Sequence, residues 1–148
     1  MINSRDIAAL NPVVADMCHD FISACHEAGI DILITSTYRD FPSQDALYAI
    51  GRTVKGANSS LLHPLGSKVT NAKGGQSYHN YRVAFDFVPL IHGKAVWDNL
   101  DLFSQCGAIG KSVGLEWAGD WTSFKELAHF QFTDGHSLAE LQNGAKIT

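Results

Sequence analysis

The sequence predicts an α+β fold in which a small central antiparallel sheet carries the functional residues and is flanked by helices. Helical and strand-like patterns are interleaved along the 148 residues. Hydrophobic residues make up 45% of the chain and charged residues 18%, which is typical of a globular protein. Because no linker, repeat or low-complexity segment interrupts these patterns, we expect one domain that spans residues 1–148.

The first third of the chain predicts a helix, a strand and a second helix. Asn11 followed by proline is a typical helix start, apolar residues then recur at helical spacing over residues 12–28, and Gly29 ends the run. A short apolar run over residues 30–34 predicts a strand, and a second helix is expected over residues 42–50.

Residues 52–76 lack sustained periodicity and are rich in glycine, serine and asparagine. Loops of this length in a small domain usually have a function, so we expect this segment to form a wall or lid of a cleft. The alternative is a disordered insertion.

The second half of the chain predicts two strands and two helices. We expect strands over residues 83–88 and 129–132, with a turn at 91–95 after the first of them. Helices are expected over residues 99–113 and 137–142, the last one with a serine cap.

Charge and hydropathy exclude several classes of protein. The formal net charge is -4 and no basic stripe is apparent, so we expect no nucleic-acid partner. No apolar stretch is long enough to cross a bilayer, and the first residues lack the pattern of a signal peptide. We therefore expect no stable membrane association, and a location in the cytoplasm of the producing cell until something else releases the protein. Nothing in the sequence demands more than a monomer.

The cysteines Cys18, Cys25 and Cys106 are odd in number and lack the spacing of a disulfide framework or a thiolate zinc site. The first two lie seven residues apart in an apolar helical pattern, so we expect buried, reduced thiols. Redox control is the alternative.

Two histidines and an aspartate form a candidate metal site: His79, Asp86 and His129. Two imidazoles and one carboxylate leave the fourth position of a tetrahedral zinc open to water. Glu126 stands three residues before the last ligand, where it can act as the base for that water. Each spacing by itself is weak, so the alternative is a chance arrangement among seven ordinary histidines.

Residues 77–86, Ser-Tyr-His-Asn-Tyr-Arg-Val-Ala-Phe-Asp, resemble the Ser-x-His-x-x-Gly-x-Ala-x-Asp motif of zinc peptidases that cut peptidoglycan stem peptides. That family includes D-alanyl-D-alanine dipeptidases, D,D-carboxypeptidases and L-alanyl-D-glutamate endopeptidases. Residues 126–129, Glu-Leu-Ala-His, are similar to its second motif. Residues 36–52, 69–75 and 114–121 resemble segments of the endopeptidase branch, especially of short phage endolysins.

The resemblance implies that His79, Asp86 and His129 bind one zinc ion and that Glu126 is the catalytic base. Two residues depart from the family pattern. Arg82 stands at the usual glycine of the first motif, where a positive φ would strain an arginine. Ala128 stands where many relatives have proline, which is a milder change.

A fixed guanidinium near the metal can stabilise the oxyanion that forms during amide hydrolysis, and the resemblance implies this role for Arg39. A structural ion pair of Arg39 with Asp40 or Asp86 is the alternative.

Other candidates have weaker assignments. Ser77 is expected to bind substrate or to orient the first ligand histidine, with a plain turn serine as the alternative, and Gln44 belongs to the endolysin-like signature. Metal-binding histidines usually donate their second ring N–H to an oxygen, and the carboxylate of Asp120 could be such an acceptor. An ordinary turn cap is the alternative. Trp117 and Trp121 could line the cleft or belong to the core.

The sequence thus predicts a zinc endopeptidase that cuts the L-alanyl-D-glutamate bond of the peptidoglycan stem peptide, as phage endolysins do during host cell lysis. Its wall substrate would lie in the periplasm. The alternatives are a D,D-carboxypeptidase or dipeptidase, and a non-catalytic zinc module that binds wall peptides. Some relatives of this kind are regulated by calcium, but no residue pattern in this chain indicates a calcium site.

Overall fold

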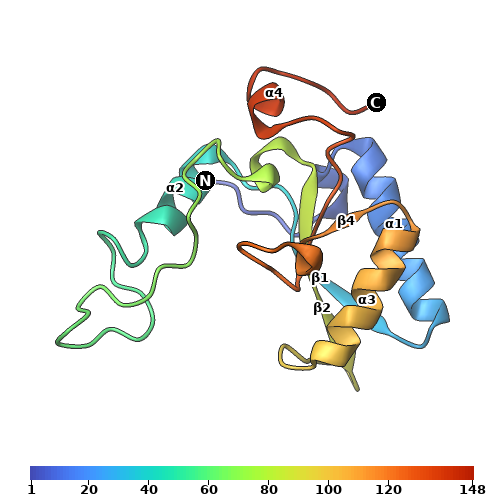
Figure 1. Cartoon of the computed structure of the whole chain (residues 1–148), viewed down its shortest axis with the longest axis horizontal. Coiled ribbons are helices and arrows are strands. Elements are labelled where there is room, and N and C mark those ends of the chain that lie inside the picture. The colour runs from blue at the N-terminus through green and yellow to red at the C-terminus, as the bar shows by residue number, and fades with distance from the viewer.

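The computed structural model describes all 148 residues and confirms the predicted α+β architecture (Figure 1). Its antiparallel strands follow the order β1-β2-β5-β4, with β3 paired to the outer end of β2. The strands are β1 (Asp31–Ser36), β2 (Ala84–Ile91), β3 (Lys94–Ala95), β4 (Glu116–Trp117) and β5 (His129–Gln131). The helices are α1 (Pro12–Glu27), α2 (Phe41–Ala49), α3 (Leu100–Ser112) and α4 (Leu138–Gln142), and short 3₁₀ turns cover Ile7–Ala9, Tyr78–Tyr81 and Ala118–Asp120.

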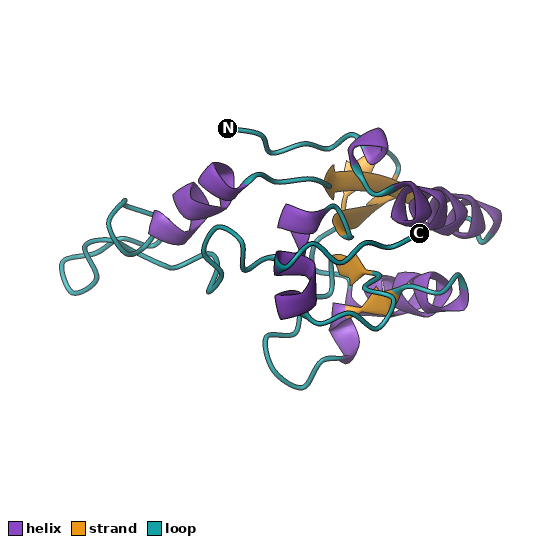
Figure 2. Cartoon of the chain, turned by 90° about the horizontal axis from the view of Figure 1, so that it is seen from above, coloured by secondary structure: helices purple, strands orange, loops and turns teal.

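Strand β2 lies between β1 and β5 and divides its side chains between the two faces of the sheet. Phe85 and Phe87 are fully buried against Phe21 of α1 and Phe130 of β5, with ring centroids 5.2 Å apart for Phe21 and Phe87. Helices α1 and α3 cover this aromatic face, and Figure 2 shows both on the same side of the strands. Because side chains alternate along a strand, Asp86 points to the opposite face.

Helix α1 begins and ends as its sequence predicts. The Asn11 side chain accepts a hydrogen bond from the backbone N–H of Val13, and Gly29 follows the last turn at φ 81°. The buried side of the helix contains Cys18 and Cys25, and Cys106 of α3 is buried beside them. All three cysteines are free, as predicted, and burial raises the pKa of Cys18 to about 12, which keeps its thiol protonated.

Most predicted elements are confirmed within a few residues, but β2 and its surroundings differ. β2 extends to Ile91, so the predicted turn is a hairpin that closes through His92 and Gly93 into β3. The sequence does not predict strand β4, because two residues are too short for a periodic pattern and only pairing with β5 defines it.

Residues 52–73, hereafter the arm, contain no helix or strand and reach away from the sheet in both views (Figures 1 and 2). The base of the arm is fixed by Arg52, whose guanidinium donates to the carbonyls of Tyr48 and Thr70 and stacks 3.7 Å above the Tyr48 ring. The predicted absence of regular structure is therefore confirmed, and the segment is nevertheless hydrogen-bonded. No helix in the molecule is both long and apolar enough to span a membrane.

Candidate metal centre and active site

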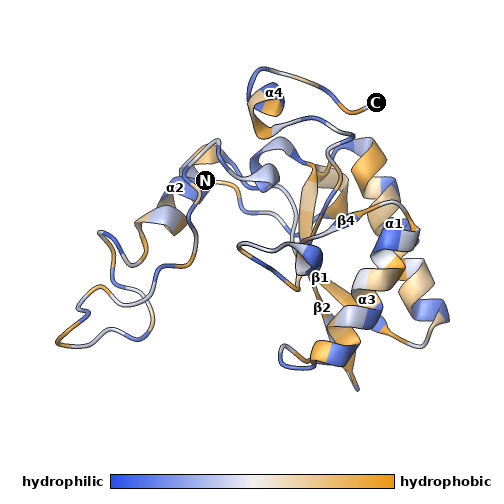
Figure 3. Cartoon of the chain, viewed as in Figure 1, coloured by the Kyte–Doolittle hydropathy of each residue, from blue (hydrophilic) through white to orange (hydrophobic).

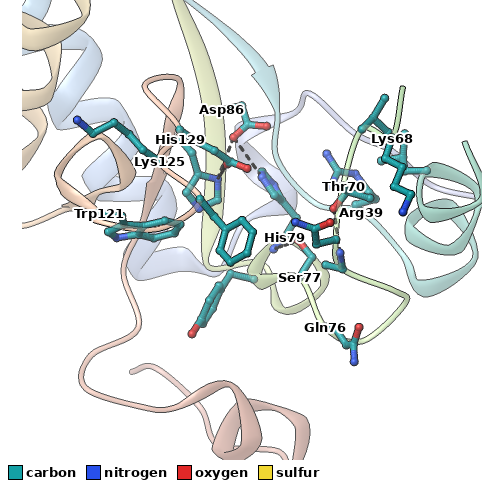
Figure 4. A pocket seen from close by; sticks show the side chains of 17 residues that line it. Arg39, Lys68, Thr70, Gln76, Ser77, His79, Asp86, Trp121, Lys125 and His129 are labelled. Atoms are coloured by element: carbon teal, nitrogen blue, oxygen red, sulfur yellow. Dashed lines mark hydrogen bonds and ion pairs between the residues drawn. The ribbon is translucent and has the colours of Figure 1, made fainter. Parts of the chain in front are cut away.

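His79, Asp86 and His129 meet on the face of the sheet opposite the aromatic core (Figure 4). Asp86 and His129 are register partners on β2 and β5, and His79 comes from the 3₁₀ turn that precedes β2. His79 Nε2 lies 3.2 Å and His129 Nδ1 lies 3.0 Å from the same oxygen, Oδ1 of Asp86. The three candidate ligand atoms all lie within 4.8 Å of one another.

Each imidazole is held from behind by an oxygen. His79 Nδ1 lies 2.8 Å from the carbonyl oxygen of Thr37, and His129 Nε2 lies 3.0 Å from Oε1 of Gln131. Because these oxygens only accept hydrogen bonds, the rear nitrogens carry protons, and a neutral ring turns its lone pair toward Asp86. The supporting contacts thus fix the tautomer that a metal ligand needs.

The cluster needs a cation at its centre. With neutral imidazoles, two lone pairs and a carboxylate face one another, an arrangement that only a shared proton or a metal ion makes favourable. When no metal is bound, protons on the histidines play the part of that cation: burial opposes charge on Asp86, but the charge and hydrogen bonds of the protonated histidines keep the pKa of this carboxyl well below its usual range. Burial likewise lowers the pKa of His129, but the hydrogen bond and charge of Asp86, the Gln131 hydrogen bond and the charge of Glu126 together outweigh burial, so the net effect is a raised pKa. Two nitrogens and one oxygen fit a divalent metal such as zinc.

Glu126 lies at the edge of the cluster in the loop before β5. Its Oε2 is 3.6 Å from His129 Nδ1, and its side chain is 61% exposed. The carboxylate therefore stands beside the ligand atoms while still facing the solvent. This is a suitable place for a group that exchanges protons with water or substrate.

Arg39 is held at the same site by neutral partners. Its guanidinium donates to Gln44 Oε1 at 2.9 Å and to Ser36 Oγ at 3.1 Å, and its Nε is buried without a partner. Burial lowers the pKa of Arg39, while the charges of Asp86 and Glu126 raise it in part. The guanidinium forms no ion pair, so its positive charge is free to act on a bound molecule.

The ion pair of Arg39 with Asp40, considered from the sequence, does not form. Asp40 instead caps α2 by accepting from the backbone N–H of Ser43, and it also accepts from the N–H of Ile2. Burial opposes charge on this carboxyl, but the hydrogen bonds from Ser43 and Ile2 and the charge of the N-terminus together outweigh burial and lower the pKa of Asp40.

A cavity of about 670 Å³ opens over the cluster, which is enough for a short peptide. Lys68 from the arm and Lys125 from the loop before β5 add positive charge to its walls (Figure 4). Trp121 forms a further wall, with its ring centroid 5.6 Å from that of His129. The predicted role of the arm as a cleft wall applies to its returning segment, residues 68–72.

A second cavity of about 350 Å³ shares Asp86, Glu126 and His129 with the first. Trp97 and Phe103 contribute to its wall. The candidate centre therefore has open space on two sides.

Of the five weaker candidates, three belong to the site, among them Trp121 as described above. Ser77 lines the cavity and caps the turn that carries the first ligand histidine, and Gln44 holds the guanidinium described above. Asp120 lies outside the site in this structure, because its carboxylate pairs with Lys111 at 2.8 Å on the surface rather than with an imidazole. Trp117 does not line either cavity. Its ring packs against Gly107 and Gly119, and its Nε1 donates to the carbonyl of Leu127 in the loop before β5.

Arg82 has the positive φ that the usual glycine would adopt, at 64°. Its guanidinium lies 3.8 Å above the ring of Tyr38 and donates to the carbonyl of Ala9 at 2.7 Å. These contacts offset a left-handed strain of about 1–2 kcal/mol. The departure from the family pattern leaves the metal-facing atoms in place.

The sequence did not predict the groups that hold the ligand histidines and Arg39. Gln131 follows His129 by two residues in a strand, so the period of two could have placed both on one face. The carbonyl of Thr37 and the hydroxyl of Ser36 had no such signal, because they reach the site only when β1 pairs with β2.

Comparisons with known proteins find similarity to peptidases. A family model described as D-alanyl-D-alanine carboxypeptidase matches residues 70–132. The chain is 37% identical over 131 residues to the peptidoglycan L-alanyl-D-glutamate endopeptidase CwlK of Bacillus subtilis, and the match covers 82% of this chain and 72% of that protein. It is 31% identical over 124 residues to the L-alanyl-D-glutamate peptidase of Listeria phage A118, with 81% of this chain matching 37% of the phage protein.

Two solved structures share the fold at low sequence identity. The L-Ala D-Glu endopeptidase ChiX of Serratia marcescens superposes with a TM-score of 0.60 at 18% identity, covering 89% of each chain. The vancomycin resistance D,D-pentapeptidase VanY, crystallised with Zn(II), gives a TM-score of 0.63 at 13% identity and covers 90% of this chain and 78% of its own.

Proposed function

Because the chain belongs to the M15 family of metallopeptidases, we propose that it is a zinc-dependent endopeptidase that hydrolyses the L-alanyl-D-glutamate bond of peptidoglycan stem peptides. The observation that carries this proposal is the convergence of three candidate ligands, a solvent-facing carboxylate and an unpaired guanidinium on one cavity. The relative that is 37% identical is an endopeptidase of this specificity.

His79, Asp86 and His129 would hold the zinc ion, with their ligand atoms already gathered within 4.8 Å. When bound, zinc supplies a Lewis acid that polarises a carbonyl group and lowers the pKa of a water molecule to about 7. The chain's own contribution is to fix the tautomers through Thr37 and Gln131.

Glu126 is the proton carrier in this proposal. As water attacks the amide carbon, a C–O bond forms and Glu126 accepts the water proton; the C–N bond then breaks and Glu126 delivers that proton to the leaving amine. Its exposure of 61% and its distance of 3.6 Å from a ligand nitrogen suit both steps.

Arg39 stabilises the negative charge that develops on the carbonyl oxygen during this attack. Its guanidinium is fixed by Gln44 and Ser36 before substrate arrives, so little reorganisation is needed. Because no carboxylate of the protein neutralises it, its charge is available to the oxyanion.

Endopeptidase rather than exopeptidase activity is supported by the space around the centre. An endopeptidase must accommodate chain on both sides of the cut bond, and two cavities of about 670 Å³ and 350 Å³ meet at Asp86, Glu126 and His129. A D,D-carboxypeptidase is the second candidate, since the matching family model carries that description. Lys68 and Lys125 suit a terminal carboxylate and equally the free carboxylate of a D-glutamyl residue.

Further parts of the proposal concern the biological setting. The phage relative supports a role as an endolysin that detaches stem peptides during host cell lysis, although this chain matches only 37% of that protein. In that setting the protein would act as a monomer on the periplasmic cell wall after release from the cytoplasm.

The test is mass spectrometry of purified muropeptides after incubation with zinc-loaded protein and with a chelator-treated control. Metal-dependent products that begin with D-glutamate support the proposal. Loss of terminal D-alanine alone would replace it with the carboxypeptidase, and intact muropeptides with zinc bound would favour a non-catalytic binding module.

A further inference from the structure

The tip of the arm presents bare leucine side chains to solvent. Leu61 is 100% exposed and Leu62 is 88% exposed, and Leu65 and Val54 in the same segment are also exposed. Figure 3 shows the hydrophobic colouring at the end of the arm, far from the core. Isolated apolar residues on a surface are ordinary, but several at the end of one projection are not.

The leucines are displayed by an ordered loop. The backbone N–H of Gly56 donates to the carbonyl of Leu65, and that of Ser67 donates to the carbonyl of Ala57, so the outgoing and returning chains are joined. Gly66 makes this close crossing possible at φ 72°, because a Cβ there would lie 2.3 Å from the carbonyl oxygen of Ala57. The hydrogen bonds thus hold the tip in a defined loop.

The arm is also strongly basic, which the sequence reasoning overlooked. Residues 46–85 contain none of the 15 acidic residues of the chain, although the protein carries a net charge of -4. The arm itself contains Arg52, Lys55, Lys68 and Lys73. Because Gly56 pairs with Leu65 and Ala57 with Ser67, Lys55 and Lys68 flank the crossing directly behind the apolar tip.

We propose that the arm docks the protein on an anionic lipid bilayer, with Leu61 and Leu62 entering the interface and Lys55 and Lys68 at the level of the headgroups. The apolar tip matches the acyl region of a bilayer, and the cations behind the tip match its anionic headgroups. A hydrated wall polymer offers negative charge but no apolar phase for the leucines. This contact is reversible and peripheral, so it is compatible with the expectation that the protein has no stable membrane association.

The tip is separate from the catalytic machinery. Neither Leu61 nor Leu62 lines either of the two cavities at the candidate site, whereas residues 68–72 line the larger one. Of the proposed docking residues only Lys68 also lines the larger cavity, so docking through Leu61, Leu62 and Lys55 does not depend on the proposed peptidase activity. Variants at the tip should leave hydrolysis of a soluble muropeptide unchanged.

The test is co-sedimentation of the full chain with vesicles of equal parts phosphatidylglycerol and phosphatidylcholine, and with vesicles of phosphatidylcholine alone. We expect binding to the anionic vesicles that weakens with added salt, and at least about a tenfold loss for the double variant Leu61→Ser/Leu62→Ser. Lys55→Gln should weaken binding by about fivefold. The matched control is Ile91→Ser/Leu100→Ser, which removes two exposed apolar side chains from the body of the protein and should bind like the original chain.

Several results would overturn the proposal. Absence of binding to anionic vesicles at low salt would do so, and so would equal binding by the tip variant and the original chain. Sedimentation velocity tests the competing explanation. If the original chain forms a dimer that the tip variant abolishes, and neither binds vesicles, the leucines would instead contact a second copy of the chain.

Discussion

Asp86 and His129 face each other as register partners on neighbouring antiparallel strands, with His129 Nδ1 3.0 Å from Asp86 Oδ1. Pairing of β2 with β5 therefore brings together two candidate ligands that lie 43 residues apart in the chain. The same pairing places Phe85 against Phe130 on the other face, where their ring centroids are 5.6 Å apart. One register thus fixes both the core and the candidate metal site.

Replacing the proposed proton carrier should abolish turnover without loss of metal. We expect Glu126→Gln to lower kcat by at least about 100-fold, because the amide cannot accept the proton of water. Glu27→Gln, at the exposed end of α1, is the matched control. Muropeptide cleavage and zinc content measured on the same samples check this, and full activity of Glu126→Gln would contradict the assigned role.

Loss of the group behind a ligand should weaken metal binding. Gln131→Leu removes the oxygen that holds His129 Nε2, so we expect zinc affinity to fall about 10–100-fold. Competition titration with a chromogenic chelator measures this, and Gln105→Leu on the surface of α3 should leave the affinity unchanged. An unaltered affinity in Gln131→Leu would show that the ring is held by its other contacts.

Removal of the arginine support should slow the reaction more than it weakens substrate binding. Gln44→Leu deletes the acceptor at 2.9 Å from the Arg39 guanidinium, so the oxyanion loses a fixed partner. We expect kcat to fall at least about tenfold with a smaller change in KM. Steady-state kinetics with a soluble muropeptide test this, and an effect on KM alone would assign Gln44 to substrate binding.

Metal binding should stabilise the fold, because a cation relieves the repulsion among the three facing ligand atoms. Zinc at about 100 times its Kd should add about 2.7 kcal/mol to the free energy of unfolding, which raises Tm by about 5–10 °C. Differential scanning fluorimetry with and without chelator measures the shift. His129→Ala should lose the zinc-dependent rise in Tm, and His26→Ala, at an exposed position, should keep this rise. A Tm that does not respond to zinc would contradict the metal site.

The strain at Arg82 predicts an order of stability. Arg82→Ala keeps the φ of 64° and loses the contacts to Tyr38 and Ala9, so we expect it to unfold about 2 kcal/mol more easily. Arg82→Gly loses the same contacts but relieves the strain, and should lie about 1 kcal/mol above the alanine variant. Urea denaturation gives this order, and equal stability of the two variants would show that no strain is stored there.

Local sequence patterns predict much of the fold and of the candidate site. Alternation in Phe85-Asp86-Phe87 is enough to place the aspartate opposite the core, and Gly29 marks the end of the first helix. The structure leaves Asp120 and Trp117 outside the site for one reason. Their partners, Lys111 and a backbone carbonyl before β5, come from neighbouring segments whose arrangement no spacing in the sequence reveals.

By itself, therefore, the sequence determined the type of donor atoms, the face on which they lie and the family to which they point. The tertiary structure decided which oxygens stand behind the imidazoles, since the carbonyl of Thr37 reaches His79 across 42 residues of chain. It also decided that the arm projects its leucines instead of burying them. The reason is physical: side-chain alternation is a local property of the backbone, whereas strand register and the partners of buried polar groups are set by packing between segments distant in the chain.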